Sequence, residues 1–493
     1  MYNVELQHKK KKYHAIERVK LLLDRGSFRE TGSQVCNYGH TEGEPVGVPY
    51  DGVITGYGTV GGRRVFVFSQ DFTVKAGTIG RRHGEQIALT LQRAVQSRCP
   101  IVGIYDSGGA RIDETINALA GCADMLHWTS LASGSVPQIA VVLGPCAGAA
   151  AYAPALSDFV FMVDPISNMF ITGPDVVKSV TGCTFSQEEL GGARVHSTTS
   201  GVAHFCYRNE KACFSNVRRL LSLLPSSCDE SPASVESVSP SSDRPVEIPQ
   251  ETRKIYDIKQ IIDAVLDEDS FLEIQEEYAK SMVVGLGRLY GRTVGIVANQ
   301  PLSEGGVINC DASDKAARFV RFCDAFNIPI LTLVDTPGYM PGIQEEHNGI
   351  LRHGAKLLYA YTEATTIKLT VILRKAYGGA YIAMGSAHLG ADRVYVLPTA
   401  EIAVMGAEAA VSVIYKKRLA AMEDKAERAE FLKQETDRYC QTYMNAAVAL
   451  HEGFVDELLQ PEELRSRLRD DIAALSKKIP MRHIPKKHGN LPL

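Results

Sequence analysis

Signatures of several common enzyme and metal-binding classes are missing from this sequence of 493 residues. Its eleven cysteines include no CxxC pair and no His at metal-ligand spacing, which excludes a zinc ribbon. There is no GxxxxGK(S/T), and no GxGxxG opens a helix after a first strand, so neither a Walker nor a Rossmann nucleotide site is predicted. No HExxH or EF-hand loop occurs, and Ser107 does not lie in a GxSxG elbow. We therefore predict no bound catalytic metal and no serine hydrolase.

The sequence also lacks a large net charge: 53 Lys and Arg residues against 57 Asp and Glu residues give a net charge of -4. We therefore expect no general attraction to nucleic acid or to an anionic membrane. The start of the chain is charged and has no apolar core of a secretory signal. Cysteines are scattered, and Cys99 and Cys146 lie in apolar runs where buried, inert thiols are expected. These features predict a cytoplasmic protein.

One apolar run, Ile139 to Val163, is nearly long enough to cross a bilayer. Glycines, prolines and one aspartate interrupt it at Gly144, Pro145, Gly148, Pro154 and Asp158. A buried strand, a glycine turn and a packed helix explain this pattern better than a membrane span. We therefore predict no direct membrane insertion.

The two halves of the chain repeat one another. Pro100–Asp106 (PIVGIYD) matches Pro329–Asp335 (PILTLVD) at an offset of 229 residues. VVLGPCAGAAAY from Val141 matches VILRKAYGGAYI from Val371 at an offset of 230 residues. Two further anchors match Gly56–Gly58 to Gly285–Gly287 at 229 and Phe170–Gly173 to Ala403–Gly406 at 233. Four anchors that hold nearly one offset over more than a hundred positions indicate an internal duplication.

A segment rich in Ser, Pro and acidic residues, 225–249, separates the two copies. It cannot bury enough apolar surface to fold alone, so we predict a linker between an N-terminal domain, 1–224, and a C-terminal domain, 250–493. Each copy is expected to form a hairpin, a helix, and apolar strands that alternate with helices. The predicted hairpins cover Val53–Phe68 and Val283–Val297, and the first helices cover Gly84–Ser97 and Asp314–Phe326. Strands that are apolar throughout are buried on both faces, which predicts an α/β fold.

Two turns in each half share one design, in which an apolar strand runs into small residues and then into a helix. They are Asp106–Ala110 and Cys146–Ala150 in the first half, and Asp335–Gly338 and Ala376–Ala380 in the second. Small residues allow a ligand to approach the backbone, and a helix start presents free N–H groups to it. The pattern favours an oxyanion hole or a phosphate cradle. The alternative is that Gly and Ala merely permit tight packing of helix on sheet.

Longer motifs carry a family resemblance. The first half contains DGV from Asp51, DSGGARI from Asp106 and GPCAG from Gly144. The second contains DTPGYMPG from Asp335, RKAYGGAY from Arg374 and a terminal KKHGNLPL. Over nearly its whole length the sequence resembles the carboxyltransferase β subunit of biotin-dependent acyl-CoA carboxylases. The resemblance is to the branch that holds propionyl-CoA carboxylase, methylmalonyl-CoA carboxyltransferase and methylmalonyl-CoA decarboxylase.

This resemblance implies two tandem crotonase-superfamily domains, β-β-α spirals, the first binding acyl-CoA and the second binding biotin. Carboxyl transfer between carboxybiotin and a coenzyme A thioester develops negative charge on the thioester oxygen and on the biotin ureido oxygen. Each oxygen needs preorganised N–H donors. By motif match, Gly148 and Ala149 would hold the enolate oxygen, while Gly379 and Ala380 would hold the biotin oxygen. The residues expected to line the substrates around them are Gly108, Gly109, Ala110, Gly378 and Tyr381.

Some positions depart from the family pattern. The family usually has Gly where Ala149 stands, and Ala keeps the N–H group at a cost in strain only if its φ is positive. Ile382 stands where propionyl-type enzymes often carry Asp, which suits short acyl chains without sharp selection among them. Arg81 and Arg82, at a predicted helix start, are candidates for the CoA phosphates or else a solvated surface. Glu114 is expected to be a solvated helix residue rather than a general base.

The resemblance predicts a subunit that moves a carboxyl group between biotin, carried by a separate protein, and a short acyl-CoA such as propionyl-CoA. The sequence contains neither a biotin carboxylase domain nor a biotinyl Met-Lys-Met segment, so separate biotin carboxylase and carrier subunits are implied. Family analogy also implies a homohexamer. One alternative is the alpha subunit of a sodium-pumping methylmalonyl-CoA decarboxylase. A more remote one is a non-catalytic crotonase-like scaffold.

Overall fold

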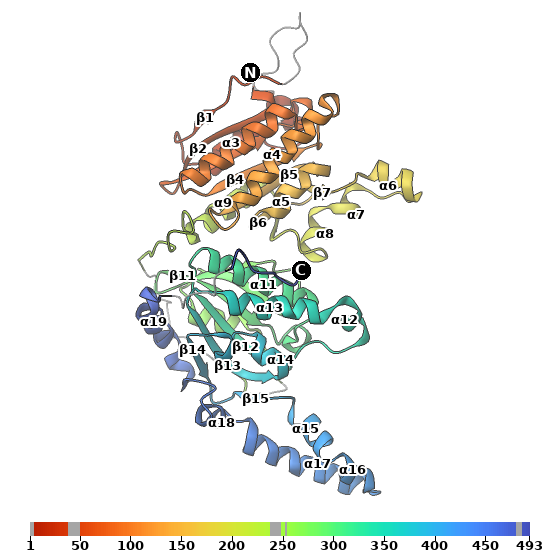
Figure 1. Ribbon diagram of the computed structural model, residues 1–493, viewed down its shortest axis with the longest axis vertical. Coiled ribbons are helices and arrows are strands. Elements are labelled where there is room, and N and C mark those ends of the chain that lie inside the picture. The colour runs from red at the N-terminus through yellow and green to blue at the C-terminus, as the bar shows by residue number, and fades with distance from the viewer. Residues whose placement is uncertain (1–3, 38–49, 237–247, 252–253, 480–485) are drawn as a thin grey trace, which may run out of the picture. The chain divides into compact units, whose positions relative to one another are not determined.

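The computed structural model describes residues 4–37, 50–236, 248–251, 254–479 and 486–493. The chain divides into two compact units, Met1–Pro232 and Ala233–Leu493, drawn from red to yellow-green and from green to blue in Figure 1. The division falls inside the predicted linker, of which residues 237–247 lie outside the described part. The first residues of that linker contact the N-terminal unit, since the amide of Cys228 donates to the carbonyl oxygen of Ser135 at 3.0 Å.

The N-terminal unit is built on a sheet that has eight strands within the described residues. Their order is β1-β2-β3-β4-β5-β6-β8, and β7 pairs with the last residues of β5. β1, β2 and β3 are antiparallel neighbours, and from β3 onward the strands are parallel. The strands are β1 (Arg29–Thr31), β2 (Val53–Val60), β3 (Arg63–Gln70), β4 (Ile101–Ser107), β5 (Gln138–Ala147), β6 (Phe159–Val163), β7 (Asn168–Phe170) and β8 (Phe205–Tyr207).

Helices bury the parallel strands of this unit on both faces. Ile101 and Tyr105 of β4 lie in one core cluster with residues of α3 and α4, which pack side by side (Figure 1). Val102 and Ile104 alternate with them and are equally buried on the opposite face. The helices are α1 (Val4–Lys9), α2 (Ala15–Leu22), α3 (Arg81–Gln96), α4 (Ile116–Ala132), α5 (Tyr152–Leu156), α6 (Pro174–Thr181), α7 (Gln187–Gly191), α8 (Ala193–Thr198) and α9 (Glu210–Leu223).

The C-terminal unit repeats the same topology in its described residues, with the order β16-β14-β13-β12-β11-β10-β9 and β15 paired with the end of β13. This agreement confirms that the two domains are similar, as the internal duplication predicts. The strands are β9 (Leu272–Ile274), β10 (Met282–Leu289), β11 (Arg292–Asn299), β12 (Ile330–Thr336), β13 (Lys368–Tyr377), β14 (Arg393–Val396), β15 (Glu401–Ala403) and β16 (Glu457–Leu458).

The helices of the C-terminal unit also follow the order of the first. α11 and α13 pack together, in the way that α3 and α4 do. The helices are α10 (Lys259–Val265), α11 (Cys310–Ala325), α12 (Ile343–Asn348), α13 (Ile350–Glu363), α14 (Gly378–Ala383), α15 (Ala407–Ile414), α16 (Lys416–Ala421), α17 (Lys425–Tyr439), α18 (Ala446–His451) and α19 (Leu464–Ala474).

The local predictions agree with these elements except at the helix starts. Both predicted hairpins are present, and the apolar run 139–163 forms β5, a short 3-10 turn, α5 and β6. Helix α3 begins at Arg81 rather than Gly84, and α11 begins at Cys310 rather than Asp314. Apolar periodicity marks only the part of a helix that packs, whereas α11 begins a turn earlier, where the Asn309 side chain accepts from the Ala312 amide at 2.8 Å.

Candidate active site

The first glycine turn of the N-terminal unit follows β4, from Ser107 to Ala110. Hydrogen bonds inside the protein use two of its amides: Gly108 donates to the carbonyl oxygen of Ala76 at 3.0 Å, and Gly109 donates to Ser107 Oγ at 3.1 Å. Gly109 has φ +100°, and a Cβ atom on it would stand 2.8 Å from the carbonyl oxygen of Ala147. The turn therefore shapes the end of β5 by direct contact, and the amides of Gly108 and Gly109 are not free for a ligand.

The second turn follows β5 and starts a short 3-10 helix at Gly148. Gly148 has φ +59°, in the left-handed region that favours glycine. Ala149 is not among the residues with positive φ, so its methyl group carries no strain of that kind. No side chain caps this helix start, and the first amides of a helix have no partner within it. Gly148 and Ala149 are half-buried, so an acceptor can approach them.

The equivalent turn of the C-terminal unit follows β13 and starts α14 at Gly378. Gly378 has φ +58°, and a Cβ atom on it would stand 3.0 Å from the carbonyl oxygen of Val404. Gly379 is exposed, and no side chain caps the helix start. The ring of Tyr339 lies 3.8 Å from the position of a Cβ atom on Gly379. Uncapped amides again face an open approach.

The strand registers make the two helix starts equivalent. Cys146 pairs with Ser107 in the first sheet, and Ala376 pairs with Thr336 in the second. Gly148 therefore corresponds to Gly378, and Ala149 corresponds to Gly379. Ala380, one residue further on, is fully buried, as is Ala150 in the first unit. In the turn that starts α14, the accessible amides are thus those of Gly378 and Gly379, whereas Ala380 is buried.

Two other predicted lining residues, Tyr381 and Ile382, lie in α14. The Ile382 side chain is exposed, whereas the Tyr381 hydroxyl is buried without a hydrogen-bond partner among the described residues. Burial raises the pKa of Tyr381. The two side chains therefore differ in polarity and in access to solvent.

Arg81 and Arg82 lie at the start of α3, as predicted, but carboxylates of their own unit pair with them. Arg81 Nε lies 2.6 Å from Glu85 Oε1, and Arg82 Nη1 lies 2.7 Å from Glu85 Oε2. Arg81 also faces Asp124 at 3.3 Å. A phosphate would have to share these two cations with Glu85.

A buried ion cluster follows the turn Ser107–Ala110, and no sequence motif predicted it. Arg111 Nη1 lies 2.6 Å from both Asp51 Oδ1 and Glu114 Oε1, and Arg111 Nη2 donates to the carbonyl oxygen of Thr78 at 2.8 Å. Glu114 Oε2 accepts the amide hydrogen of Arg81 at 2.6 Å. The expectation of a solvated Glu114 is therefore wrong, because this carboxylate closes a buried cluster at the start of α3.

Burial in and around the cluster shifts the pKa values of Asp51 and of the neighbouring His83. Burial raises the pKa of Asp51, against the opposing charge of Arg111. Burial, reinforced by the charge of Arg111, lowers the pKa of His83 to about 3. His83 is therefore neutral at physiological pH and donates or accepts hydrogen bonds without charge.

Within the described ranges, no group of three or more His, Cys, Asp or Glu side chains is placed to hold a metal ion. In that same part of the chain, no helix is both long and apolar enough to pass through a bilayer. All eleven cysteines lie in the described residues and none forms a disulfide bond; Cys99 and Cys146 are buried, as predicted.

Known proteins share this architecture and sequence. The family model described as "Carboxyl transferase domain" matches residues 6–491. The propionyl-CoA carboxylase carboxyltransferase subunit of Haloferax mediterranei is 49% identical over 492 residues, which cover 99% of this chain and 95% of that protein. The propionyl-CoA carboxylase beta chain of Saccharopolyspora erythraea is 48% identical, with 99% and 92% covered.

A solved structure gives the same result. Transcarboxylase 12S, described as a hexamer with methylmalonyl-coenzyme A and methylmalonic acid bound, is similar with a TM-score of 0.94 and 44% identity. The match covers 99% of this chain and 94% of that one. These findings confirm the predicted resemblance and favour the carboxyltransferase interpretation over the decarboxylase alternative. The chain therefore belongs to the carboxyl transferase domain family, as a carboxyltransferase β subunit of the biotin-dependent acyl-CoA carboxylase type.

Proposed function

We propose that this chain transfers a carboxyl group between biotin on a separate carrier protein and a short acyl-CoA such as propionyl-CoA. The observation that carries the proposal is the pair of equivalent helix starts, one in each unit. Each begins with a left-handed glycine, Gly148 or Gly378, and neither is capped by a side chain. A reaction in which charge develops on two oxygens needs two such donor groups.

The N-terminal unit acts on the acyl-CoA in this proposal. When the bond between the α-carbon and the carboxyl group forms or breaks, the thioester oxygen carries negative charge as an enolate. The amides of Gly148 and Ala149 donate to this oxygen, and the turn Gly108–Ala110 lines the same site. Loss of one such donor typically lowers the rate by about 10²–10³.

The C-terminal unit acts on biotin. Its turn can accept a carbonyl-type oxygen, because Gly379 is exposed and no side chain caps the helix start. Biotin, when bound, supplies the nitrogen that carries the carboxyl group. The sequence assigns its ureido oxygen to the amides of Gly379 and Ala380. Because Ala380 is buried, we propose instead that the amides of Gly378 and Gly379 hold and orient this oxygen, with Tyr381 and Ile382 beside them.

The proposal extends to partners. A separate biotin carboxylase carboxylates the biotin, and a separate carrier subunit holds it. The chain assembles as a homohexamer, since the similar transcarboxylase 12S is described as one. The absence of disulfide bonds among its described cysteines suits the reducing cytoplasm. Arg81 and Arg82 at the start of α3 stay candidates for the coenzyme A phosphates, which would have to replace Glu85 as their partner; the alternative is a solvated surface.

Decarboxylation of methylmalonyl-CoA in the presence of free biotin tests the proposal. Gly379→Pro removes one N–H group at a helix start, where proline is sterically tolerated. We expect it to lower kcat by about 10²-fold or more. Gly379→Ala is the matched control, because it keeps the N–H group and its Cβ atom would stand in ordinary contact, 3.8 Å from the Tyr339 ring.

The N-terminal turn is tested in the same way, with Ala149→Pro against Ala149→Gly. Wild-type rates in both proline variants would overturn the assignment of these amides. An intact complex that turns over no acyl-CoA would instead favour the scaffold alternative.

A further inference from the structure

Each unit buries one aspartate at the end of a central parallel strand, directly before its first glycine turn. Asp106 ends the apolar part of β4 and Asp335 that of β12, and neither side chain is exposed. A buried carboxylate must be paired or hydrogen-bonded. The two units solve this requirement with different cations.

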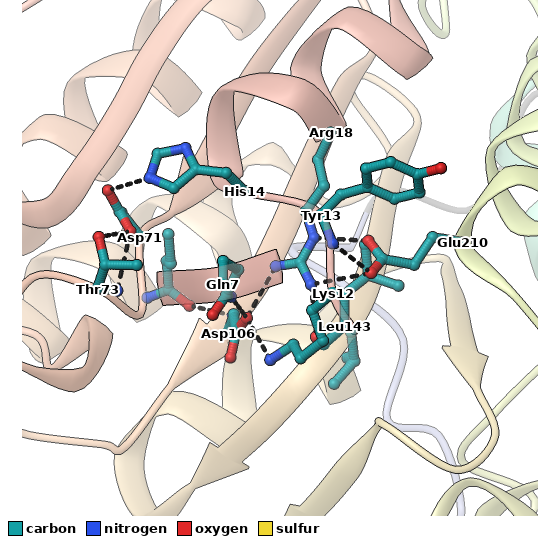
Figure 2. Close-up of polar contacts among 12 residues, drawn as sticks. Gln7, Lys12, Tyr13, His14, Arg18, Asp71, Thr73, Asp106, Leu143 and Glu210 are labelled. Carbon is teal, nitrogen blue, oxygen red and sulfur yellow. Dashed lines mark hydrogen bonds and ion pairs between the residues drawn. The ribbon is translucent and has the colours of Figure 1, made fainter. Parts of the chain in front are cut away.

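In the N-terminal unit the cations come from outside the sheet (Figure 2). Arg18 of α2 places Nη1 2.8 Å from Asp106 Oδ2, and Lys12, from the segment before α2, places Nζ 2.6 Å from the same oxygen. Gln7 of α1 donates to this oxygen at 3.0 Å. Arg18 also binds Glu210 of α9 at 2.7 Å, so its guanidinium is fully enclosed.

In the C-terminal unit the cation comes from the next strand. Arg374 of β13 places Nε 2.8 Å from Asp335 Oδ2, and the backbone amide of Lys375 donates to Asp335 Oδ1 at 3.3 Å. The equivalent positions in β5 are Gly144 and Pro145. A Cβ atom on Gly144 would stand 1.9 Å from Asp106 Oδ1, and Pro145 has no N–H group to donate.

Both strands are irregular at this point. Pairing between β4 and β5 jumps from Tyr105–Val142 to Ser107–Cys146, and pairing between β12 and β13 jumps from Val334–Ile372 to Thr336–Ala376. Residues 143–145 and 373–375 therefore leave the regular ladder just before the helix starts. Such a bulge keeps a single conformation only if other groups form hydrogen bonds with its unpaired backbone N–H and C=O groups.

Arg18 supplies that contact in the N-terminal unit. Its Nη2 donates to the carbonyl oxygen of Leu143 at 2.8 Å, at the start of the irregular segment. In the C-terminal unit, Thr399 Oγ1 donates to the equivalent carbonyl of Leu373 at 2.7 Å. One guanidinium thus joins the end of β4, which leads to Gly108–Ala110, to the part of β5 that leads to Gly148.

We propose that Arg18 is a positioning residue of the acyl-CoA turn, supported by Lys12, and that it does from α2 what Arg374 and Thr399 do together in the second unit. This inference rests on the proposed function, because it assigns Gly148 and Ala149 to the acyl-CoA. Arg18 does not touch the substrate. It fixes the distance between two turns whose amides and backbone form the site.

The test measures kcat and KM for methylmalonyl-CoA, with free biotin as acceptor, on full-length Arg18→Lys and Arg18→Met. Lysine keeps the charge beside Asp106 but cannot also reach Leu143 and Glu210 as the planar guanidinium does. We expect kcat to fall about tenfold in Arg18→Lys and further in Arg18→Met. Both KM values should stay within about twofold of wild type, because positioning of a transition-state donor acts on kcat.

The matched control is Arg218→Lys. Arg218 lies in the same unit and also donates to a carbonyl oxygen, that of Leu22, and to a carboxylate, that of Asp24. It contacts neither glycine turn through these bonds, so its variant should keep wild-type kcat. All rates are taken where circular dichroism shows the variants folded.

Wild-type kcat in both Arg18 variants, with activity lost in Ala149→Pro, would overturn this inference and leave the proposed function standing. A raised KM with unchanged kcat would overturn it too. Activity kept in Ala149→Pro would instead overturn the proposed site itself. If the Arg18 variants do not fold, Lys12→Met decides the question: a kcat lowered about threefold at unchanged KM supports the inference, and wild-type kcat overturns it.

Discussion

The carbonyl oxygen of Ala147 lies 2.8 Å from the point where a Cβ atom on Gly109 would stand. The two glycine turns of the N-terminal unit therefore touch through backbone alone, and Gly109 also has a φ of +100°. A side chain at this position has to displace the end of β5, which leads into Gly148.

We expect Gly109→Ala to lower both stability and turnover. The backbone conformation and the close contact together should cost on the order of 1–3 kcal/mol. Displacement of the amides of Gly148 and Ala149 should lower kcat about tenfold or more. Thermal unfolding and methylmalonyl-CoA decarboxylation with free biotin measure the two effects.

Gly108→Ala is the control for this change. A Cβ atom on Gly108 would meet Thr78 Cγ2 at 3.4 Å, an ordinary contact, and its φ is not in the left-handed region. Equal losses in both variants would contradict the role given to the contact between Gly109 and Ala147.

Glu114 gives a second prediction, because it stood as the alternative general base. Glu114→Gln breaks one charged contact of Arg111 and leaves Asp51 paired. We expect a stability loss of about 1.5–3 kcal/mol and a fall in kcat of less than tenfold. Removal of a general base would cost about 10²–10⁴ and change the pH profile of kcat. Asp113→Asn, on the exposed neighbour, controls for charge.

The fold could be predicted from the sequence because its signals are local and repeated. Apolar strands such as Ile139–Val142 and the doubled offsets of 229 and 230 residues fix the alternation of strand and helix in both halves. Helix starts were less predictable, because caps such as Asn309 lie outside the apolar pattern.

The two helix starts of the site were also predictable, since Gly148 and Gly378 follow apolar strands in the sequence. The ion cluster of Asp51, Arg111 and Glu114 was not, because Asp51 lies 60 residues before Arg111 and no sequence pattern links the two. Arg18 escaped for the same reason: its partner Asp106 is 88 residues away, and only the folded sheet brings them together.

Lys368 predicts a pH dependence of stability. Burial, and next the charge of Lys478, lowers the pKa of Lys368 to about 8 from its ordinary 10.5. Between these two values the unfolded chain binds a proton that the folded chain does not, so stability rises with pH. Between pH 8 and 10.5 we expect the free energy of unfolding of the wild type to rise by on the order of 1–3 kcal/mol more than that of Lys368→Met. Urea unfolding at both pH values measures this, and parallel curves for the two proteins would contradict it.

Thiol exposure predicts the order of alkylation. Cys183 is exposed, whereas Cys146 and Cys213 are fully buried and burial raises the pKa of both thiols. Iodoacetamide should therefore modify Cys183 in the native protein and spare Cys146 and Cys213 until it unfolds. Peptide mass spectrometry after a short native reaction reads this directly. Early labelling of Cys146 would show that the strand β5 opens.

Carboxyl transfer requires the acyl α-carbon to meet the biotin nitrogen, so we expect the exposed, apolar Ile382 beside the biotin turn at Gly378 to touch the acyl chain and to set its selectivity. An apolar side chain discriminates between homologous chains only by the 1–3 kcal/mol or so that one methylene contributes. We expect kcat/KM for acetyl-, propionyl- and butyryl-CoA to differ by less than about tenfold between neighbouring members, measured with the cognate biotin subunit. Ile382→Asp places a charge where apolar contact is lost, so it should lower kcat/KM most for butyryl-CoA. Ile382→Val removes one methylene and keeps the surface apolar, so it should leave the order of substrates unchanged. Strict exclusion of butyryl-CoA by the wild type would contradict this account, because an isoleucine that is 43% exposed leaves room for a longer chain to turn aside.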